Sequence, residues 1–163
     1  MVSNSKTPAP LVETQCMPDD FSGGFMHVIH MLYVGIQKHL ETMLSSQSQI
    51  SFSQFVILVG FSHNDKSCMT QAKLAEHLTL TEATVSRHIT TLVAMGLLSK
   101  EKDSHNKKTY NVAITKEGVK AFTRAKKIIM QELDALFAHI SEKDKAVLIK
   151  NFTATIALLH QKK

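Results

Sequence analysis

The spacing of hydrophobic residues predicts a long helix near the start of the chain. From Phe21 onward, apolar residues recur at steps of three and four, as on one face of a helix, until about Leu44. They are Phe25, Ile29, Leu32, Ile36, Leu40 and Met43. Residues 1–20 lack this period and hold all three prolines, so we expect a flexible arm there.

Ser and Thr residues at helix starts divide the middle of the chain into shorter helices. Ser51 or Ser53 can cap a helix over residues 54–61, because a side-chain oxygen there accepts a hydrogen bond from the first turn. Thr70 and Thr81 can cap the next two helices, which a tight turn separates. The pattern therefore predicts three short helices after the long one.

The next segment reads as a hairpin of two strands. Gly96 stands where a helix ends in a left-handed residue. Strands are predicted at 97–102 and 109–114, and the second alternates apolar with polar residues, as expected when one face packs. The connection between them lacks Gly and Pro, yet it is rich in hydrogen-bond donors and lysines.

Two long helices are predicted after the hairpin. Thr115 can cap the first of them. Ser141 and Asp144 resemble a capping box, with Asp in place of the usual Glu or Gln, at the start of the second. The predicted fold is mainly α with a small β-hairpin.

Length and composition indicate one globular domain over residues 21–163. A chain of 163 residues with 44% hydrophobic residues can bury a core. The apolar run 55–61 is far too short to span a bilayer, and the N-terminus lacks the pattern of a signal peptide. We expect a cytoplasmic protein with no membrane partner.

Positive charge is concentrated in the second half of the chain. The net charge is +5, but residues 98–127 alone carry nine Lys or Arg against three acids. A stretch this basic suits a polyanionic partner, although a solvated helix face is the alternative.

The segment 69–103 predicts a helix-turn-helix. Its leucines and Val85 can pack two short helices across a turn, while the second helix keeps small donors and one Arg outside. That outer face carries Thr81, Glu82, Thr84, Ser86, Arg87, His88 and Thr91. Arg can bind guanine bidentately, and Ser or Thr can bond bases or phosphates, so the face suits the major groove. A plain helical hairpin with a polar surface is the alternative, and the basic hairpin downstream argues against it.

Several motifs together resemble the MarR (multiple antibiotic resistance regulator) family of winged-helix transcription factors. They are Phe52–Phe55, the run LAEHLTLTEATVSRHITTLVAMGLLSKEKD, Asn106–Lys108 and AITKEGVKAF. The resemblance implies a winged helix-turn-helix lobe at about 50–116 and dimerisation helices at about 21–45 and 116–160. It also implies a homodimer whose two lobes bind one palindromic operator in double-stranded DNA.

The resemblance assigns DNA contacts to the recognition helix and to the wing, which is the hairpin. The recognition-helix candidates are Thr81, Ala83, Thr84, Ser86, Arg87 and His88, with Arg87 the first choice. The wing candidates are Asp103, Ser104, His105, Asn106, Lys107 and Lys108. The family's wing commonly reads D-x-R-D-x-R, and here His105 and Asn106 replace Arg and Asp. We therefore expect the wing to bind phosphates more than to discriminate bases.

The residues define less clearly which signal the protein would sense. The resemblance implies a small aromatic or phenolic effector, and the candidate pocket residues are Met26, His30, Tyr33, Phe55 and Val59, for which core packing is the alternative. Cys16 and Cys68 are candidates for redox sensing, again with plain free thiols as the alternative. His27 and His30 share a helix face but have no third ligand nearby in sequence, so we expect no metal and no cofactor.

The sequence thus favours a DNA-binding transcriptional regulator, with a repressor released by a small molecule as the expected form. A thiol-based redox regulator of the same fold and a winged helix that binds only proteins are the alternatives. No GxSxG, GxxxxGK[ST], HExxH or GxGxxG motif occurs, so we do not expect an enzyme.

Overall fold

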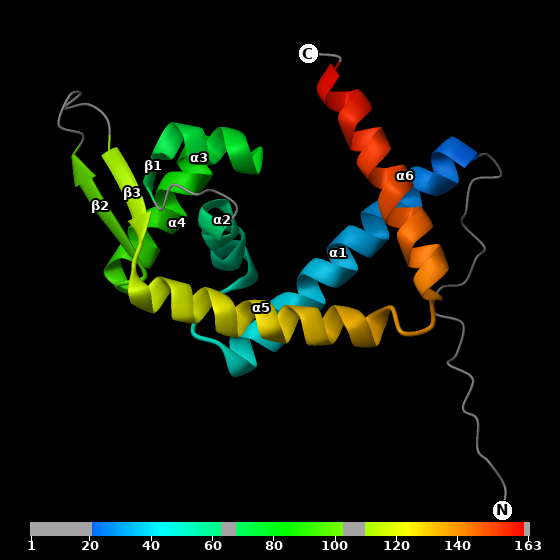
Figure 1. Cartoon of the computed structure of the whole chain (residues 1–163), viewed down its shortest axis with the longest axis horizontal. Coiled ribbons are helices and arrows are strands. Elements are labelled where there is room, and N and C mark those ends of the chain that lie inside the picture. Colours follow the sequence, from blue (N-terminus) through cyan, green and yellow to red (C-terminus); the bar gives the residue numbers. More distant parts are fainter. Residues whose placement is uncertain (1–20, 63–67, 103–109, 162–163) are drawn as a thin grey trace, which may run out of the picture. The chain divides into compact units, whose positions relative to one another are not determined.

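The computed structural model describes residues 21–62, 68–102 and 110–161. Six helices and three strands are present in these ranges (Figure 1). They are α1 (Phe21–Gln47), α2 (Phe52–Ser62), β1 (Cys68–Thr70), α3 (Gln71–Leu78), α4 (Glu82–Ala94), β2 (Leu98–Lys102), β3 (Tyr110–Ile114), α5 (Lys116–Leu136) and α6 (Glu142–Gln161). The described residues divide into two compact units, with the boundary after His39, inside α1. The fold class predicted from the sequence is confirmed.

Threonine caps begin three of the helices, as the sequence predicted. The Oγ1 of Thr70, Thr81 and Thr115 accepts from the backbone N–H of the third residue after it, over 3.3, 3.2 and 3.0 Å respectively. Each bond satisfies an N–H that the helix itself leaves without a partner.

A reciprocal capping box begins α2. Ser51 Oγ accepts from the Gln54 backbone N–H over 3.1 Å, and Gln54 Oε1 accepts from the Ser51 N–H over 2.9 Å. Glu41 of α1 also accepts from the Phe52 N–H over 2.8 Å. Ser51 rather than Ser53 is therefore the cap, and the helix begins two residues before the predicted start.

The sheet has one strand more than the predicted hairpin. The order is β1-β3-β2, all antiparallel, with Met69 opposite Val112 and Lys100 also opposite Val112 on the other side. Three residues are too few to show a period of two, which explains why β1 could not be recognised from the sequence.

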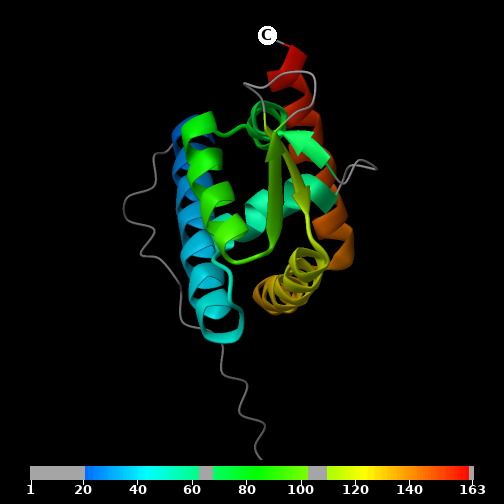
Figure 2. The same ribbon diagram turned by 90° about the vertical axis from the view of Figure 1, so that its left-hand side faces the viewer.

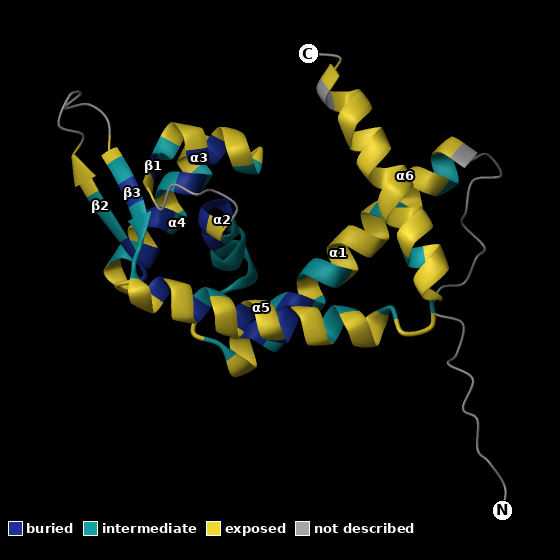
Figure 3. Cartoon of the chain, in the orientation of Figure 1, coloured by how far each residue is buried: buried dark blue, intermediate teal, exposed yellow. Residues whose placement is uncertain are grey.

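The core of the larger unit lies among α2, α3, α4 and the sheet, where buried residues gather in Figure 3. Aliphatic side chains fill it, and no buried polar or charged side chain occurs in the described ranges. Its fully buried members include Ile57, Leu58, Leu74, Val85, Ile89, Leu92 and Val112. The core therefore fixes the helix-turn-helix against the sheet by hydrophobic packing.

Two glycines next to the wing meet different requirements. Gly96 has φ +71°, the left-handed end that the sequence predicted for α4. Gly118, in the first turn of α5, permits a close backbone approach, because a Cβ there would clash with the Leu97 carbonyl oxygen. The same carbonyl accepts from the Thr115 N–H over 3.1 Å, so α5 is fixed to the start of the wing.

We expect Gly118→Ala to lower the free energy of unfolding by about 3 kcal/mol, the upper end for overpacking, because backbone must move. Gly60→Ala is the matched control. A Cβ at Gly60 meets the movable Leu74 Cδ1, and the helix propensity gained, about 1 kcal/mol, offsets part of the cost. Urea unfolding of both variants measures the difference, and an equal loss in both would refute the proposed role of the Leu97 contact.

Helix α6 exposes most of its apolar side chains (Figure 3). At roughly 100° per residue, five of them fall within one third of the helix circumference. This apolar stripe of α6 consists of Leu148, Ile149, Phe152, Ile156 and Leu159, and all five are exposed. An apolar stripe of this length is unusual on a free surface and indicates an interaction site.

The N-terminal part of α1 also exposes large apolar side chains. Those between residues 25 and 34 are Phe25, Met26, Val28, Met31, Leu32, Tyr33 and Val34. No helix of the described residues is both long and apolar enough to cross a membrane.

Candidate nucleic-acid interface

A tight turn sets the angle between α3 and α4. Thr79 adopts a left-handed conformation with φ 55°, which is uncommon for a β-branched residue. Its N–H donates to the Glu76 carbonyl over 3.1 Å, and the Leu80 N–H donates to the Ala75 carbonyl over 3.0 Å. These bonds satisfy carbonyls at the end of α3 and offset the strain.

Helix α4 has one buried side and one open side. Val85, Ile89 and Leu92 are fully buried, so the opposite side of the helix faces outward. Figure 2 shows α4 running beside the strands of the wing, and α4 contacts β2. Helix α4 therefore lies next to the wing, and its open side is free to contact a ligand.

The outward row of α4 follows helical spacing through Arg87. Ala83, Arg87, Thr90 and Ala94 are all exposed, and Thr91 lies beside them. Ser86 and His88 are half-buried on the two flanks of the row. No described residue forms an ion pair or hydrogen bond with the Arg87 side chain, so its guanidinium is available to a ligand.

The hydroxyls of α4 differ in what they can offer. Thr90 Oγ1 donates to the Ser86 carbonyl over 2.9 Å, and Thr91 Oγ1 donates to the Arg87 carbonyl over 3.3 Å. Each thus keeps its oxygen lone pairs for a donor such as a base amino group. Thr84 Oγ1 is 2.8 Å from Thr81 Oγ1, so the cap holds both of these hydroxyls.

Thr90 is exposed in the same row as Arg87 but was not among the predicted candidates. It follows Arg87 by three residues and therefore shares its helix face, a signal that the sequence does contain.

Positive side chains line the stem of the wing. Lys100 Nζ lies 4.4 Å from the centre of the Tyr110 ring, a cation–π contact that joins β2 to β3. Lys102 is exposed at the end of β2. The predicted tip contacts at 103–108 lie outside the described residues, so they stay predictions.

Part of the described chain, from α2 to the start of β3, matches a family model. The family model of the MarR family matches residues 50–110, from just before α2 to the first residue of β3. Residues 50–110 belong to the MarR family.

Solved structures share the fold around this MarR domain. A MarR transcriptional regulator from Methanosarcina mazei Go1 superposes with a TM-score of 0.75 at 21% identity, covering 85% of this chain and 98% of that one. A single-site mutant of MarR from E. coli, complexed with operator DNA, gives 0.71 at 20% identity, covering 80% and 92%. PcaV from Streptomyces coelicolor, in complex with its natural ligand, gives 0.68 at 17% identity, covering 86% and 96%. No curated protein sequence matches the chain.

The candidate effector residues fall on two helices. Met26, His30 and Tyr33 lie exposed on the part of α1 that belongs to the smaller unit. Phe55 and Val59 lie half-buried on α2 in the MarR domain, and the Phe55 ring stacks on Phe122 of α5 with 5.3 Å between centroids. Phe55 thus has a packing role in the larger unit, and the pocket as a whole stays a prediction.

The two cysteines differ in position. Cys68 lies exposed in β1, paired with Ala113 of β3. Cys16 lies outside the described residues. Among the described His, Cys, Asp and Glu side chains, no group of three could hold a metal ion.

Proposed function

We propose that the chain is a transcriptional regulator that binds double-stranded DNA in a sequence-specific manner. The observation that carries the proposal is the open side of α4, where Arg87 is exposed and has no protein partner among the described residues, on a helix that contacts the lysine-bearing strand β2. Arg suits the guanine edge in the major groove, and lysines suit phosphates. The MarR family match and the shared fold with E. coli MarR in complex with operator DNA support the same function.

We further propose that the regulator acts as a homodimer in the cytoplasm. The exposed apolar side chains of α1 and α6 support this, because a second copy would remove them from water. Two identical lobes then bind a palindromic site, with half-site centres about 10 bp apart if the two recognition helices enter successive major grooves.

Release of DNA by a small aromatic or phenolic effector is the expected mode of regulation. The PcaV structure with its natural ligand shares the fold and supports a ligand-responsive regulator. Met26, His30, Tyr33, Phe55 and Val59 remain the candidate contacts.

Selection from random double-stranded DNA by the purified chain tests the proposed function. We expect enrichment of one inverted repeat with half-sites about one helical turn apart. Failure to enrich any sequence, with the protein folded by circular dichroism, would exclude sequence-specific binding and favour a winged helix that binds proteins.

The wing should contribute to affinity without setting sequence preference. We expect Lys107→Ala to weaken binding to all duplexes alike and to flatten the plot of log K against log salt by about one unit, because one phosphate contact is lost. Fluorescence anisotropy across a salt series measures the slope. Lys150→Ala, at an exposed position of α6, is the control and should leave the slope unchanged. A change of base preference in Lys107→Ala would contradict the assignment.

A further inference from the structure

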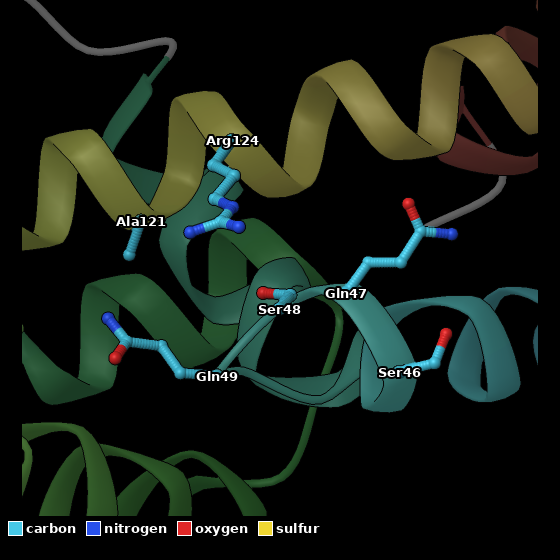
Figure 4. Close-up of a pocket in the computed structure, with 6 residues that line it drawn as sticks. All are labelled: Ser46, Gln47, Ser48, Gln49, Ala121 and Arg124. Carbon is cyan, nitrogen blue, oxygen red and sulfur yellow. The ribbon is translucent and has the colours of Figure 1, made fainter.

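A polar hollow lies between the turn after α1 and the middle of α5. It is half-open, has a volume of about 290 Å³ and is lined by Ser46, Gln47, Ser48, Gln49, Ala121 and Arg124. Figure 4 shows the Arg124 side chain extending from α5 toward the turn that carries Ser48. Since every lining side chain except Ala121 is polar, the hollow fits a hydrophilic molecule better than an aromatic ring.

Arg124 gives the hollow a preference for anions. No carboxylate lines the hollow, and within the described part of the chain no group forms an ion pair or hydrogen bond with Arg124. A planar guanidinium can donate two parallel hydrogen bonds to a carboxylate or a phosphate. Such a group on a ligand would therefore have a defined position in the hollow.

The turn offers further donors opposite Arg124. Ser48 Oγ accepts from the Ile50 N–H over 3.2 Å, which leaves the hydroxyl hydrogen of Ser48 to donate to a ligand. Gln47 and Gln49 carry side-chain amides that can both donate and accept. Hydroxyl groups on a ligand would find partners here.

The face of α5 that carries Arg124 is positively charged. Lys116, Lys120, Arg124 and Lys127 lie on one side of α5 at helical spacing, and only Lys120 among them has an acidic partner in the described residues, Glu117 at 2.7 Å. The C-terminal end of α1 lies beside the hollow, and its carbonyl groups disfavour negative charge. Affinity for an anion must therefore come mainly from Arg124.

We propose that this hollow binds a small hydrophilic anion, with a carboxylate or phosphate group on Arg124 and hydroxyl groups on Ser48 and the two glutamines. The site differs in place and chemistry from the aromatic effector pocket predicted above. Binding to it requires no DNA, so it can be tested whether or not the proposed function holds.

Isothermal titration of the full chain at constant ionic strength tests the proposal, with sodium phosphate, sodium gluconate and sodium benzoate as probes. We expect phosphate or gluconate to bind saturably, and the one that binds identifies the anionic group. Arg124→Gln should weaken that binding at least about tenfold, the loss of a charged hydrogen bond. Benzoate should bind more weakly, because Ala121 is the only apolar residue that lines the hollow and could contact its ring.

Lys126→Gln is the matched control for charge. It removes one positive charge from the same helix, roughly on the opposite side from the hollow, and should leave the affinity unchanged. Arg124→Lys keeps the charge but loses the paired donors, so its affinity for the anion should fall between that of the unchanged protein and that of Arg124→Gln. Melting temperatures without ligand establish that the variants fold.

Three results would overturn the proposal. One is no saturable binding of phosphate or gluconate up to tens of millimolar. Another is equal weakening by Arg124→Gln and Lys126→Gln, which would show a general attraction to basic surface. The third is benzoate binding as tightly as the hydrophilic probes.

Discussion

Replacing Arg87 with alanine is expected to weaken binding to the selected operator by about 1–3 kcal/mol, roughly 5- to 150-fold, and to relax the base preference at one position of each half-site. The reason is geometric. Arg87 stands at the centre of the outward row of α4, opposite the fully buried Val85, Ile89 and Leu92. A guanidinium there can bond two acceptors of one guanine, and alanine can bond neither.

Arg124→Ala is the natural control, because Arg124 is the only other arginine in the sequence and lies on α5. It should leave the base preference unchanged. Anisotropy titrations against the operator and single-base variants measure both proteins. If Arg87→Ala weakened binding to all duplexes equally, we would conclude that Arg87 contacts phosphates. Other residues of the outward row of α4 would then determine the base preference.

Charging the apolar stripe of α6 is expected to produce monomers and to reduce operator binding at least about 100-fold. Ile149 and Ile156 are 68% and 54% exposed and lie two helical turns apart on one face. The double variant Ile149→Glu, Ile156→Glu should therefore fold as a single chain yet place charge in an apolar dimer interface, where unpaired charge is costly. Loss of the dimer removes the gain from binding two half-sites together.

A matched variant separates this effect from added charge alone. Ala154→Glu with Ala157→Glu places the same two charges on the opposite, exposed side of α6. Sedimentation velocity should show monomers for the first variant and dimers for the second. If both variants stayed dimeric, α6 would not form the dimer interface.

Much of the fold could be predicted because local chemistry decides it. The caps at Thr70, Thr81 and Thr115 and the left-handed Gly96 follow from the hydrogen bonds and backbone angles that these positions need. The buried face of α4 follows from the spacing of Val85, Ile89 and Leu92. These features depend on residues close together in the chain.

Features that depend on distant residues could not be predicted. Strand β1 exists because Cys68–Thr70 pairs with β3, more than forty residues away in the sequence. The approach of Gly118 to the Leu97 carbonyl and the position of Arg124 opposite residues 46–49 arise only after the helices pack. The exposure of Ala83 and Arg87 on α4, by contrast, could be predicted from helical spacing, whereas the wing candidates at 103–108 stay predictions.

The central claim is tested most directly by anisotropy titration of the purified chain with the selected duplex and with a scrambled duplex. The titrations are done at about 50 and about 200 mM salt, which lie below and above physiological ionic strength. We predict tighter binding to the selected duplex at both salt concentrations and a steep loss of affinity for both duplexes at the higher one. Equal affinity for the two duplexes, or no binding to either, would contradict the proposal that this chain is a sequence-specific DNA-binding regulator.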